Sequence, residues 1–368
     1  MFFYLVTFAA TLLFFYFACK FKNNSIEQWI FSILSISVAS FLAGVRDYTI
    51  GTDTLFYAYD VFYDACASMS YNLFDPRYLE RFEPGYLLLN FIVGRCSSDL
   101  HVMLFVMMFI QMLFMVKGLL YYKDKMPVIW GLAAFLFMYY NVSLNIARQM
   151  MAAAIIFYSY RFVLEKRLVP FVACIVLAFM FHRSAFIFFV AYPLQIYFER
   201  KQDVKSVVLM VVFLILGMII IQQTISSVLN VIGLDSKYGY YFRYASHGFF
   251  LTKLLLGIPL FLLFLMYSKR IFCDADKEDY YLLFCLLVSV LSTQAREWIG
   301  ESAERLVLYF SFFQILALPR VLYFTIPSRF FVMRIYMGYW FVYWYYNFIY
   351  NGFQATYPYT SDVLKHLF

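Results

Sequence analysis

The sequence predicts an all-α polytopic membrane protein, and three observations lead to this fold class. Of the 368 residues, 64% are hydrophobic and only 14% carry a charge. The mean hydropathy of +0.73 lies above the range typical of soluble globular domains. Apolar runs recur along the whole chain with short polar joints between them. We therefore expect one transmembrane helical bundle over residues 1–368.

About twelve transmembrane helices are expected from these apolar runs. The run at residues 86–96 is too short to count and is expected to be re-entrant or interfacial. The expected spans cover residues 2–19, 27–45, 101–122, 127–141, 146–163, 168–181, 184–198, 206–222, 250–267, 280–295, 305–323 and 330–350.

Clusters of lysine and arginine orient the expected bundle, because short cytoplasmic loops carry an excess of these residues. The clusters lie at residues 20–22, 123–125, 166–167, 200–205, 269–277 and 329–334. All fall on one side, which we take as cytoplasmic, so the outer loops 46–100 and 223–249 are expected to contribute to a site outside. This topology accounts for most of the net charge of +7, and no nucleic-acid partner is expected.

Arginines on the outer side break this pattern. A charge at membrane depth costs roughly 2.5 to 3.5 kcal/mol on insertion scales, so it is retained when something compensates it. A guanidinium group can donate two parallel hydrogen bonds to the oxygens of one phosphate, and it stays positively charged. These arginines therefore predict an anion site. Interfacial anchoring is the alternative for each, and Arg305 could also pair with Glu301 one turn earlier. The outer arginines are Arg46, Arg148, Arg183 and Arg305 at span ends, with Arg243 and Arg296 in loops.

The stretch NVSLNIARQMMAAA, residues 141–154, places polar side chains at the outer end of a span. Asn145, Arg148 and Gln149 follow at the i, i+3 and i+4 spacing that shares one helix face. We expect this face to bind a ligand. The alternative is an ordinary helix start, in which Asn145 caps the helix and Arg148 extends to the interface.

The stretch FHRSA, residues 181–185, places a histidine at an outer turn. Histidine is the side chain whose ordinary pKa lets it take a proton near neutral pH. His182 is therefore a candidate general base. The alternative is an interfacial histidine bonded to a carbonyl group.

Acidic residues occur in the first outer loop. In RDYTIGTDTLFY, residues 46–57, Asp53 and Tyr57 would share one helix face, and FEPGYLLLN places Glu83 before a Pro-Gly turn. Carboxylates accept hydrogen bonds from sugar hydroxyls, and aromatic faces pack on sugar rings. Asp53 and Glu83 are candidate catalytic acids or bases, with Tyr57 as a sugar contact. An interfacial amphipathic helix capped by Asp53 is equally consistent with the first stretch.

Nothing in the sequence indicates a metal or cofactor. The six cysteines are scattered without a CxxC pair or a cysteine and histidine cluster. We expect no cofactor and no metal.

Six segments, taken in order, resemble the EpsG-like branch of the Wzy family of polysaccharide polymerases, and the resemblance covers nearly the whole chain. It implies a fold similar to multi-spanning glycosyltransferases that use lipid-linked sugars (GT-C-like), in the bacterial inner (plasma) membrane with the active site facing the periplasm or exterior. The segments are RDYTIGTDTLFY, EPGYLLLN, NIARQMMAAAIIF, FHRSAFIF, ERLVLYF and YPYT.

The resemblance also implies a reaction. A growing glycan would be transferred from undecaprenyl pyrophosphate onto the non-reducing end of a lipid-linked oligosaccharide repeat unit, in O-antigen, capsule or exopolysaccharide synthesis. Arg46, Arg148 and Arg305 would hold the pyrophosphate, with Arg183 as a further candidate. His182, Asp53 or Glu83 would take the proton. Membrane lipids and a chain-length regulator protein are the other expected partners.

Two other classes of membrane protein compete with this interpretation. A lipid-linked oligosaccharide flippase would also bind pyrophosphate, but it should show two similar halves and charges along a central path. A membrane acyltransferase would use a histidine near the cytoplasmic side. A scaffold protein would not need arginines at four outer helix ends.

Overall fold

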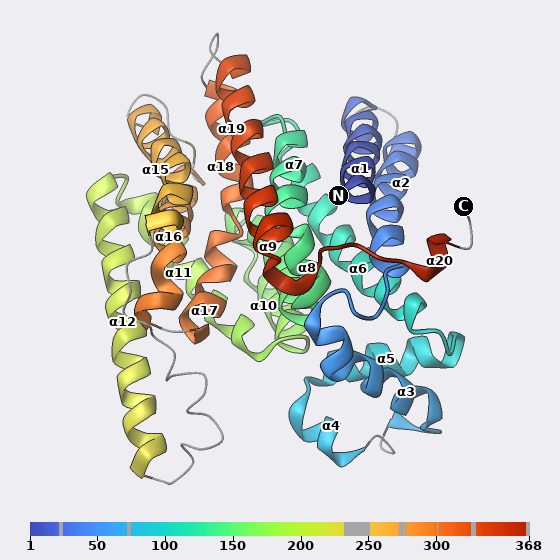
Figure 1. Ribbon diagram of the computed structural model, residues 1–368. Helices are drawn as coiled ribbons and strands as arrows, with labels where there is room; N and C mark the ends of the chain where they lie inside the picture. Colours follow the sequence, from blue (N-terminus) through green and yellow to red (C-terminus); the bar gives the residue numbers. More distant parts are fainter. Residues whose placement is uncertain are drawn as a thin grey trace. The chain divides into compact units, whose positions relative to one another are not determined.

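The computed structural model describes residues 1–21, 25–71, 75–231, 251–271, 276, 278–299, 301–324 and 329–365. All the secondary-structure elements in these ranges are helices, which confirms the all-α prediction (Figure 1). The chain forms two compact units. The first comprises Met1–Arg161, Val169–Phe186 and Phe330–Phe368, and the second comprises Phe162–Leu168 and Ile187–Arg329. The expectation of one bundle stays a prediction.

The first unit is built from the N-terminal helices, the folded outer segment and the C-terminal helices, and α9, α10 and α19 extend a few residues beyond its limits. Its helices are α1 Phe2–Lys20, α2 Ser25–Gly44, η1 Thr54–Ala58, α3 Tyr59–Ala67, α4 Pro76–Arg81, α5 Pro84–Cys96, α6 Leu100–Tyr121, α7 Ile129–Met138, α8 Tyr140–Asn145, α9 Ala147–Leu164, α10 Leu168–Phe179, α19 Arg329–Trp344, η4 Tyr345–Tyr350, η5 Phe353–Ala355 and α20 Asp362–Lys365.

The main segment of the second unit begins inside the 3-10 helix η3, Arg183–Val190, which therefore crosses the boundary between the units. The first part of the predicted outer loop 223–249 is helical instead, because α12 continues to Val231 through a stretch without glycine or proline. The rest of that predicted loop, residues 232–249, lies outside the described residues. The helices are α11 Ala191–Arg200, α12 Val204–Val231, α15 Leu251–Ile271, α16 Asp279–Ile299, α17 Glu301–Ser311 and α18 Gln314–Phe324.

Several helices are long and apolar enough to cross a membrane. Among the described residues, four qualify by length and composition, and five shorter apolar helices accompany them. The chain is therefore a helical membrane protein, and the number of about twelve spans stays a prediction. The four long ones are Phe2–Lys20, Ser25–Gly44, Leu100–Tyr121 and Arg305–Tyr323.

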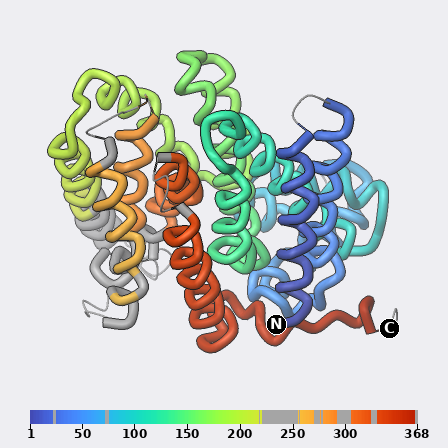
Figure 2. Tube along the Cα trace, turned by 90° about the horizontal axis from the view of Figure 1, so that it is seen from above, coloured from blue at the N-terminus to red at the C-terminus, as the bar shows by residue number. Residues whose placement is uncertain are grey.

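Aromatic side chains form the core of the first unit. Helices α1 and α2 lie side by side (Figures 1 and 2). Phe8 on α1 lies with its ring centroid 5.3 Å from that of Tyr140 on α8 and 6.0 Å from that of Trp344 on α19. The indole of Trp344 is fully buried and donates a 2.8 Å hydrogen bond to the side-chain oxygen of Asn141. This cluster joins the two ends of the chain to α8, the helix that borders the candidate site.

The segment after η4 runs past the start of α1 and ties the outer loop in place (Figure 2). The hydroxyl of Tyr4 donates to the carbonyl of Thr356 at 2.6 Å, and the amide of Gly51 donates to the carbonyl of Ala355 at 2.9 Å. The hydroxyl of Tyr359 donates to the carbonyl of Leu42 at 2.7 Å, at the end of α2. The YPYT motif thus helps to fix the segment that carries Arg46.

A buried ion cluster holds three helices of the second unit together. Arg320 on α18 has only 1% of its side chain exposed, and its Nε donates to Oδ1 of the fully buried Asp279 at 2.7 Å. The hydroxyl of Tyr267 on α15 donates to the same oxygen at 2.6 Å, and Arg320 also pairs with Asp276. Because every charge here has a partner, the cluster lets a guanidinium persist inside an apolar bundle.

Replacing Arg320 by leucine should leave Asp279 buried without its counter-ion. We expect Arg320→Leu to lower the free energy of unfolding by about 3 kcal/mol, seen as a lower apparent Tm in detergent. The double variant Arg320→Leu/Asp279→Asn removes both charges and should recover part of the loss. An apparent Tm of Arg320→Leu equal to that of the wild type would contradict this account.

Candidate functional site

A close helix approach brings the EPG turn against the FHR turn. Pro84 begins α5, a position where its missing N–H costs no helical hydrogen bond. The amide of Gly85 donates to the carbonyl of Met180 at 2.8 Å, and a Cβ on Gly85 would lie 2.7 Å from that oxygen. Only glycine fits here. The amide of Arg183 then reaches Oε1 of Glu83 at 3.3 Å.

A break between α8 and α9 brings the third motif to the same place. The helix ends at Asn145 and restarts at Ala147, so Asn145 and Arg148 do not share one continuous helix face as predicted. Helices are broken at membrane depth where the freed backbone groups find partners in the protein. Here the carbonyl of Leu144 accepts a 2.9 Å hydrogen bond from Nη2 of Arg46. Gly51, at φ +81°, packs against that carbonyl with no room for a Cβ.

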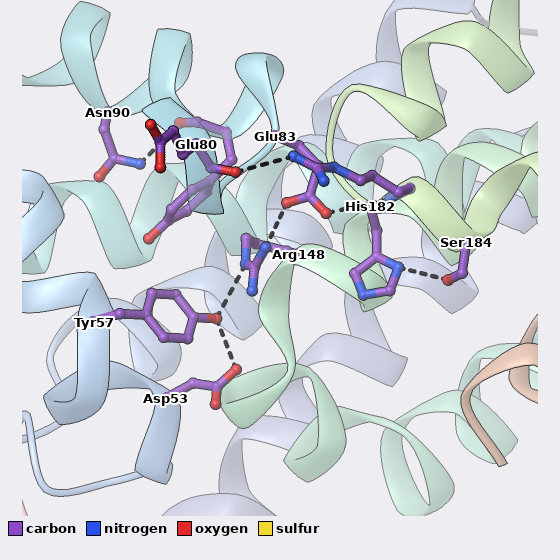
Figure 3. Close-up of polar contacts among 10 residues, drawn as sticks. Asp53, Tyr57, Glu80, Glu83, Asn90, Arg148, His182 and Ser184 are labelled. Carbon is purple, nitrogen blue, oxygen red and sulfur yellow. Dashed lines mark hydrogen bonds and ion pairs between the residues drawn. The ribbon is translucent and has the colours of Figure 1, made fainter. Parts of the chain in front are cut away.

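Arg148 lies at the centre of the resulting cluster (Figure 3). Its Nη1 forms an ion pair with Oε2 of Glu83, and the side chains of both residues are largely buried. Its Nε donates to the hydroxyl of Tyr57 at 3.2 Å. Its guanidinium carbon lies 4.9 Å from the ring centroids of Tyr57 and Phe82 and 5.6 Å from that of Tyr86. Three aromatic rings at these distances hold the guanidinium of Arg148 in one orientation.

Tyr57 links the arginine to a second carboxylate. Its hydroxyl donates to Oδ2 of Asp53 at 2.7 Å (Figure 3). Burial raises the pKa of Tyr57 well above its ordinary value; the charge of Arg148 opposes this shift and that of Asp53 adds to it. The phenol therefore stays protonated near neutral pH and acts as a donor to the Asp53 carboxylate.

Arg46 is a second buried cation in the same place. Its side chain is 3% exposed, and Nη2 contacts Oγ1 of Thr54 at 3.4 Å in addition to the Leu144 carbonyl. Its Nε has no hydrogen-bond partner, and no carboxylate pairs with it, among the residues that the structure describes. A buried charge held only by neutral groups is costly, which makes this guanidinium a candidate partner for an anion.

A small cavity of about 30 Å³ separates the two arginines. Five of the predicted residues line it, together with apolar side chains of α6. A volume of this size holds one or two water molecules and no larger ligand. The polar lining residues are Arg46, Asp53, Thr54, Tyr57, Tyr86, Gln111, Ser143, Asn145 and Arg148.

Besides Glu83, which pairs with Arg148, three predicted residues of the first unit do not line this cavity in the described structure. The guanidinium of Arg183 reaches the carbonyl of Glu80 at 3.4 Å. Nδ1 of His182 lies 2.6 Å from the hydroxyl oxygen of Ser184 (Figure 3). Gln149 is buried in α9 with 2% of its surface exposed. The amide of Arg183 is connected to Arg148 through Glu83, and His182 is its neighbour in the chain.

The remaining predicted arginines cannot be assigned to this cluster. Arg305 lies on α17 in the second unit, which is described by itself. Arg296 belongs to α16, but its side chain lies outside the described residues, as does the whole of Arg243. Within the described part of the chain, no group of three or more His, Cys, Asp or Glu side chains is placed to hold a metal ion.

Sequence reasoning missed three contributors to the cluster. Phe82 and Tyr86 flank the EPG turn, and their positions beside Glu83 are the signal that could have identified them as walls for Arg148. Gln354 accepts a 2.5 Å hydrogen bond from Nδ2 of Asn145, whose Oδ1 accepts from the amide of Asp53 at 2.9 Å. No local pattern predicts a contact across 209 positions.

The helices and the buried cationic cavity define a polytopic membrane protein with a site suited to an anionic ligand. The family model of the EpsG family matches residues 28–361, and the chain belongs to this family. No curated protein and no solved structure matches it. Family membership indicates a role of the polysaccharide polymerase type.

Adding one methyl group at residue 85 should force the EPG and FHR turns apart. We expect Gly85→Ala to lower the free energy of unfolding by about 1 to 3 kcal/mol, because the new Cβ meets a backbone carbonyl that cannot yield easily. The matched control is Gly338→Ala, where nothing lies within 4 Å of the added atom. Equal apparent Tm values for the two variants would show that the close approach is not needed.

Proposed function

We propose that this protein is a polysaccharide polymerase of the glycosyltransferase type. It transfers a growing glycan from undecaprenyl pyrophosphate onto the non-reducing end of a lipid-linked oligosaccharide repeat unit at the outer face of the membrane. The observation that carries this proposal is a pair of arginines, the buried Arg46 and the largely buried Arg148, on the walls of one cavity. Family membership supports the same reaction class.

The two arginines match the electrostatic demand of the leaving group. In the transfer, the acceptor hydroxyl oxygen forms a bond to the anomeric carbon of the donor. The bond from that carbon to the phosphate oxygen breaks, and its electron pair stays on the pyrophosphate. Fixed cations stabilise the charge that develops on this leaving group. Arg46 is suited to this role because its charge is not neutralised by a described carboxylate.

Arg148 would change partners when the donor binds. In the structure it pairs with Glu83, and the cavity of about 30 Å³ is too small for a pyrophosphate. We infer that the phosphate oxygens replace the Glu83 carboxylate on the guanidinium, since both anions accept paired hydrogen bonds from arginine. Glu83 then serves as a built-in substitute for the ligand and keeps the buried charge compensated between turnovers.

The acceptor hydroxyl must lose a proton, and Asp53 is the best-placed carboxylate to take it. Asp53 lines the cavity, and Tyr57 holds one of its oxygens. Oε2 of Glu83 accepts from Arg148 and Oε1 accepts from the Arg183 amide, which suits Glu83 to positioning these residues. His182 stays a candidate base through its place beside Arg183.

The proposal also specifies the membrane topology of the chain, its partners and its product. The chain crosses the bacterial inner membrane about twelve times, in an arrangement similar to GT-C-like glycosyltransferases, with Arg46, Arg148 and His182 facing the periplasm or exterior. Arg183, Arg305, Arg243, Arg296, Gln149 and Asn145 act as further substrate contacts. Membrane lipids and a chain-length regulator protein are the remaining proposed partners. The product is an O-antigen, a capsule or a secreted exopolysaccharide.

Glycan length in a polymerase-null strain supplied with the matching repeat unit provides the test of function. Wild type should give a ladder on a gel. Arg46→Ala and Arg148→Ala should each reduce polymerisation by about 100-fold or more, because each removes a fixed charge from the leaving-group site. Arg148→Lys should also fail, since lysine cannot make the paired contacts.

The matched control for these variants is Arg77→Ala. Arg77 lies in the same outer segment, but its side chain is exposed and pairs with the nearby Asp75. It should leave the ladder unchanged at equal protein level. Wild type that yields single repeats only would contradict the polymerase proposal. A ladder that survives Arg46→Ala and Arg148→Ala would contradict the assigned site.

Reporter fusions test the orientation. Fusions after residues 60 and 182 should report the outer side, and a fusion after residue 123 should report the cytoplasm, because the lysine clusters stay inside. A cytoplasmic result at residue 182 would contradict an outer active site and favour the acyltransferase class.

A further inference from the structure

A second, larger pocket lies in the first unit, between the ends of three helices. It has a volume of about 340 Å³ and is bordered by the beginning of α2, the end of α6 and the end of α9. This volume falls within the range of pockets that bind small molecules. The side chains that matter here are Gln28, Trp29, Lys117, Lys123, Tyr158 and Arg161.

Three cations line this pocket, and no aspartate or glutamate is among its described lining residues. Lys117 and Lys123 form no ion pair with a described carboxylate. The nearest acids in the sequence, Glu27 and Asp124, do not line the pocket. Like charges that converge in one pocket repel one another, so a bound anion would lower the energy of the arrangement.

Neutral partners hold two of the cations in place without cancelling their charge. Nζ of Lys117 lies 5.2 Å from the ring centroid of Trp29. Nζ of Lys123 donates to Oε1 of Gln28 at 3.1 Å, and Gln28 is itself held by a 3.0 Å hydrogen bond to the carbonyl of Ala18. The pocket is therefore built by side chains that are positioned before any ligand arrives.

A close approach between α6 and α9 completes the pocket. A Cβ on Gly118 would lie 2.6 Å from the ring of Phe157, so the two helices touch beside the pocket. Tyr158 and Arg161 on α9 thereby lie next to Lys117 on α6, and the guanidinium carbon of Arg161 is 4.1 Å from the ring centroid of Tyr158. Packed helices therefore supply most of the pocket lining, and Lys123 comes from the turn that follows α6.

The position along the helices suggests the source of the anion. Lys123 belongs to one of the basic clusters that mark the cytoplasmic side, and Lys117 lies in α6 about one turn before its end at Tyr121. Trp29, Tyr121 and Tyr158 are the residue types enriched at the level of lipid headgroups. Basic pockets between transmembrane helices on the cytoplasmic side bind anionic headgroups.

We propose that this pocket, lined by Lys117, Lys123 and Arg161, binds a phosphate-bearing anion at the cytoplasmic face of the membrane. The phosphate comes from an anionic lipid headgroup or from a free phosphate in the cytoplasm. The site lies at the opposite ends of α6 and α9 from the cavity that holds Arg148. It does not depend on the polymerase proposal.

Lipid retention by the full-length purified protein tests the proposal. Native mass spectrometry would count bound lipid after exchange into detergent containing phosphatidylglycerol or phosphatidylcholine, with inorganic phosphate titrated in a separate arm. Wild type should retain phosphatidylglycerol over phosphatidylcholine. The variant Lys117→Gln/Lys123→Gln/Arg161→Gln should weaken that retention by about tenfold or more, since each basic residue contributes to headgroup attraction.

The matched control is Lys20→Gln/Lys125→Gln/Lys201→Gln, which removes the same charge from exposed cytoplasmic positions outside the pocket. It should retain phosphatidylglycerol like the wild type. The single variants Lys117→Gln and Lys123→Gln repeat the test if the triple variant does not fold.

The arms distinguish the two sources. Selective phosphatidylglycerol binding that the pocket variants lose identifies a lipid headgroup. Binding of inorganic phosphate with the same variant sensitivity, and no lipid selectivity, identifies a free phosphate. Equal losses in the pocket and control variants, or no selective anion in either arm, would overturn the proposal.

Discussion

The buried ion pair between Arg148 and Glu83 is the constraint on which the site depends. The two residues are 65 positions apart, and they meet only because the α8–α9 break, the Gly85 contact with Met180 and the FHR turn all converge. A largely buried guanidinium is tolerated when a carboxylate and aromatic faces surround it. The same surroundings keep Arg148 oriented toward a cavity that also receives the unneutralised Arg46. The stability of this cluster and its proposed function therefore both require an anion that compensates the charge of the arginines.

The two ends of the chain support this site from outside the motifs. Tyr4, Tyr140 and Trp344 pack together, and the segment around Thr356 joins α1 to the loop that carries Gly51. Extreme aromatic content suggests interfacial belts when it is considered from composition alone. In the structure a large part of it is instead packed inside the first unit, where flat rings fill the space between helices without adding polar groups that need partners.

Hydropathy correctly predicted an all-helical chain, because segments that cross a bilayer must satisfy their backbone hydrogen bonds internally. It placed Asp53, Tyr57, Glu83 and Arg148 on one side of the membrane, and the structure joins these four in one hydrogen-bonded chain. Hydropathy could not predict which side chains form hydrogen bonds and ion pairs with one another. The pairing of Arg320 with Asp279, 41 positions earlier, and the link from Asn145 to Gln354 depend on tertiary packing. The expected joint between residues 141 and 146 lies close to the observed break at Ile146, but the sequence did not show that α8 continues to Asn145. Arg305 shows the same limit, because helix spacing gives its place on α17 but not its distance from Arg148.

The central claim is that the Arg46 and Arg148 cavity supports glycan transfer from a pyrophosphate-linked lipid. The most direct measurement follows the purified protein in liposomes with its lipid-linked repeat unit and no other protein, counting glycan length and released undecaprenyl pyrophosphate over time. The account predicts chains of several repeats, with one pyrophosphate lipid released for each new linkage. Movement of intact repeat units across the bilayer with no lengthening and no release would contradict it and identify a transporter.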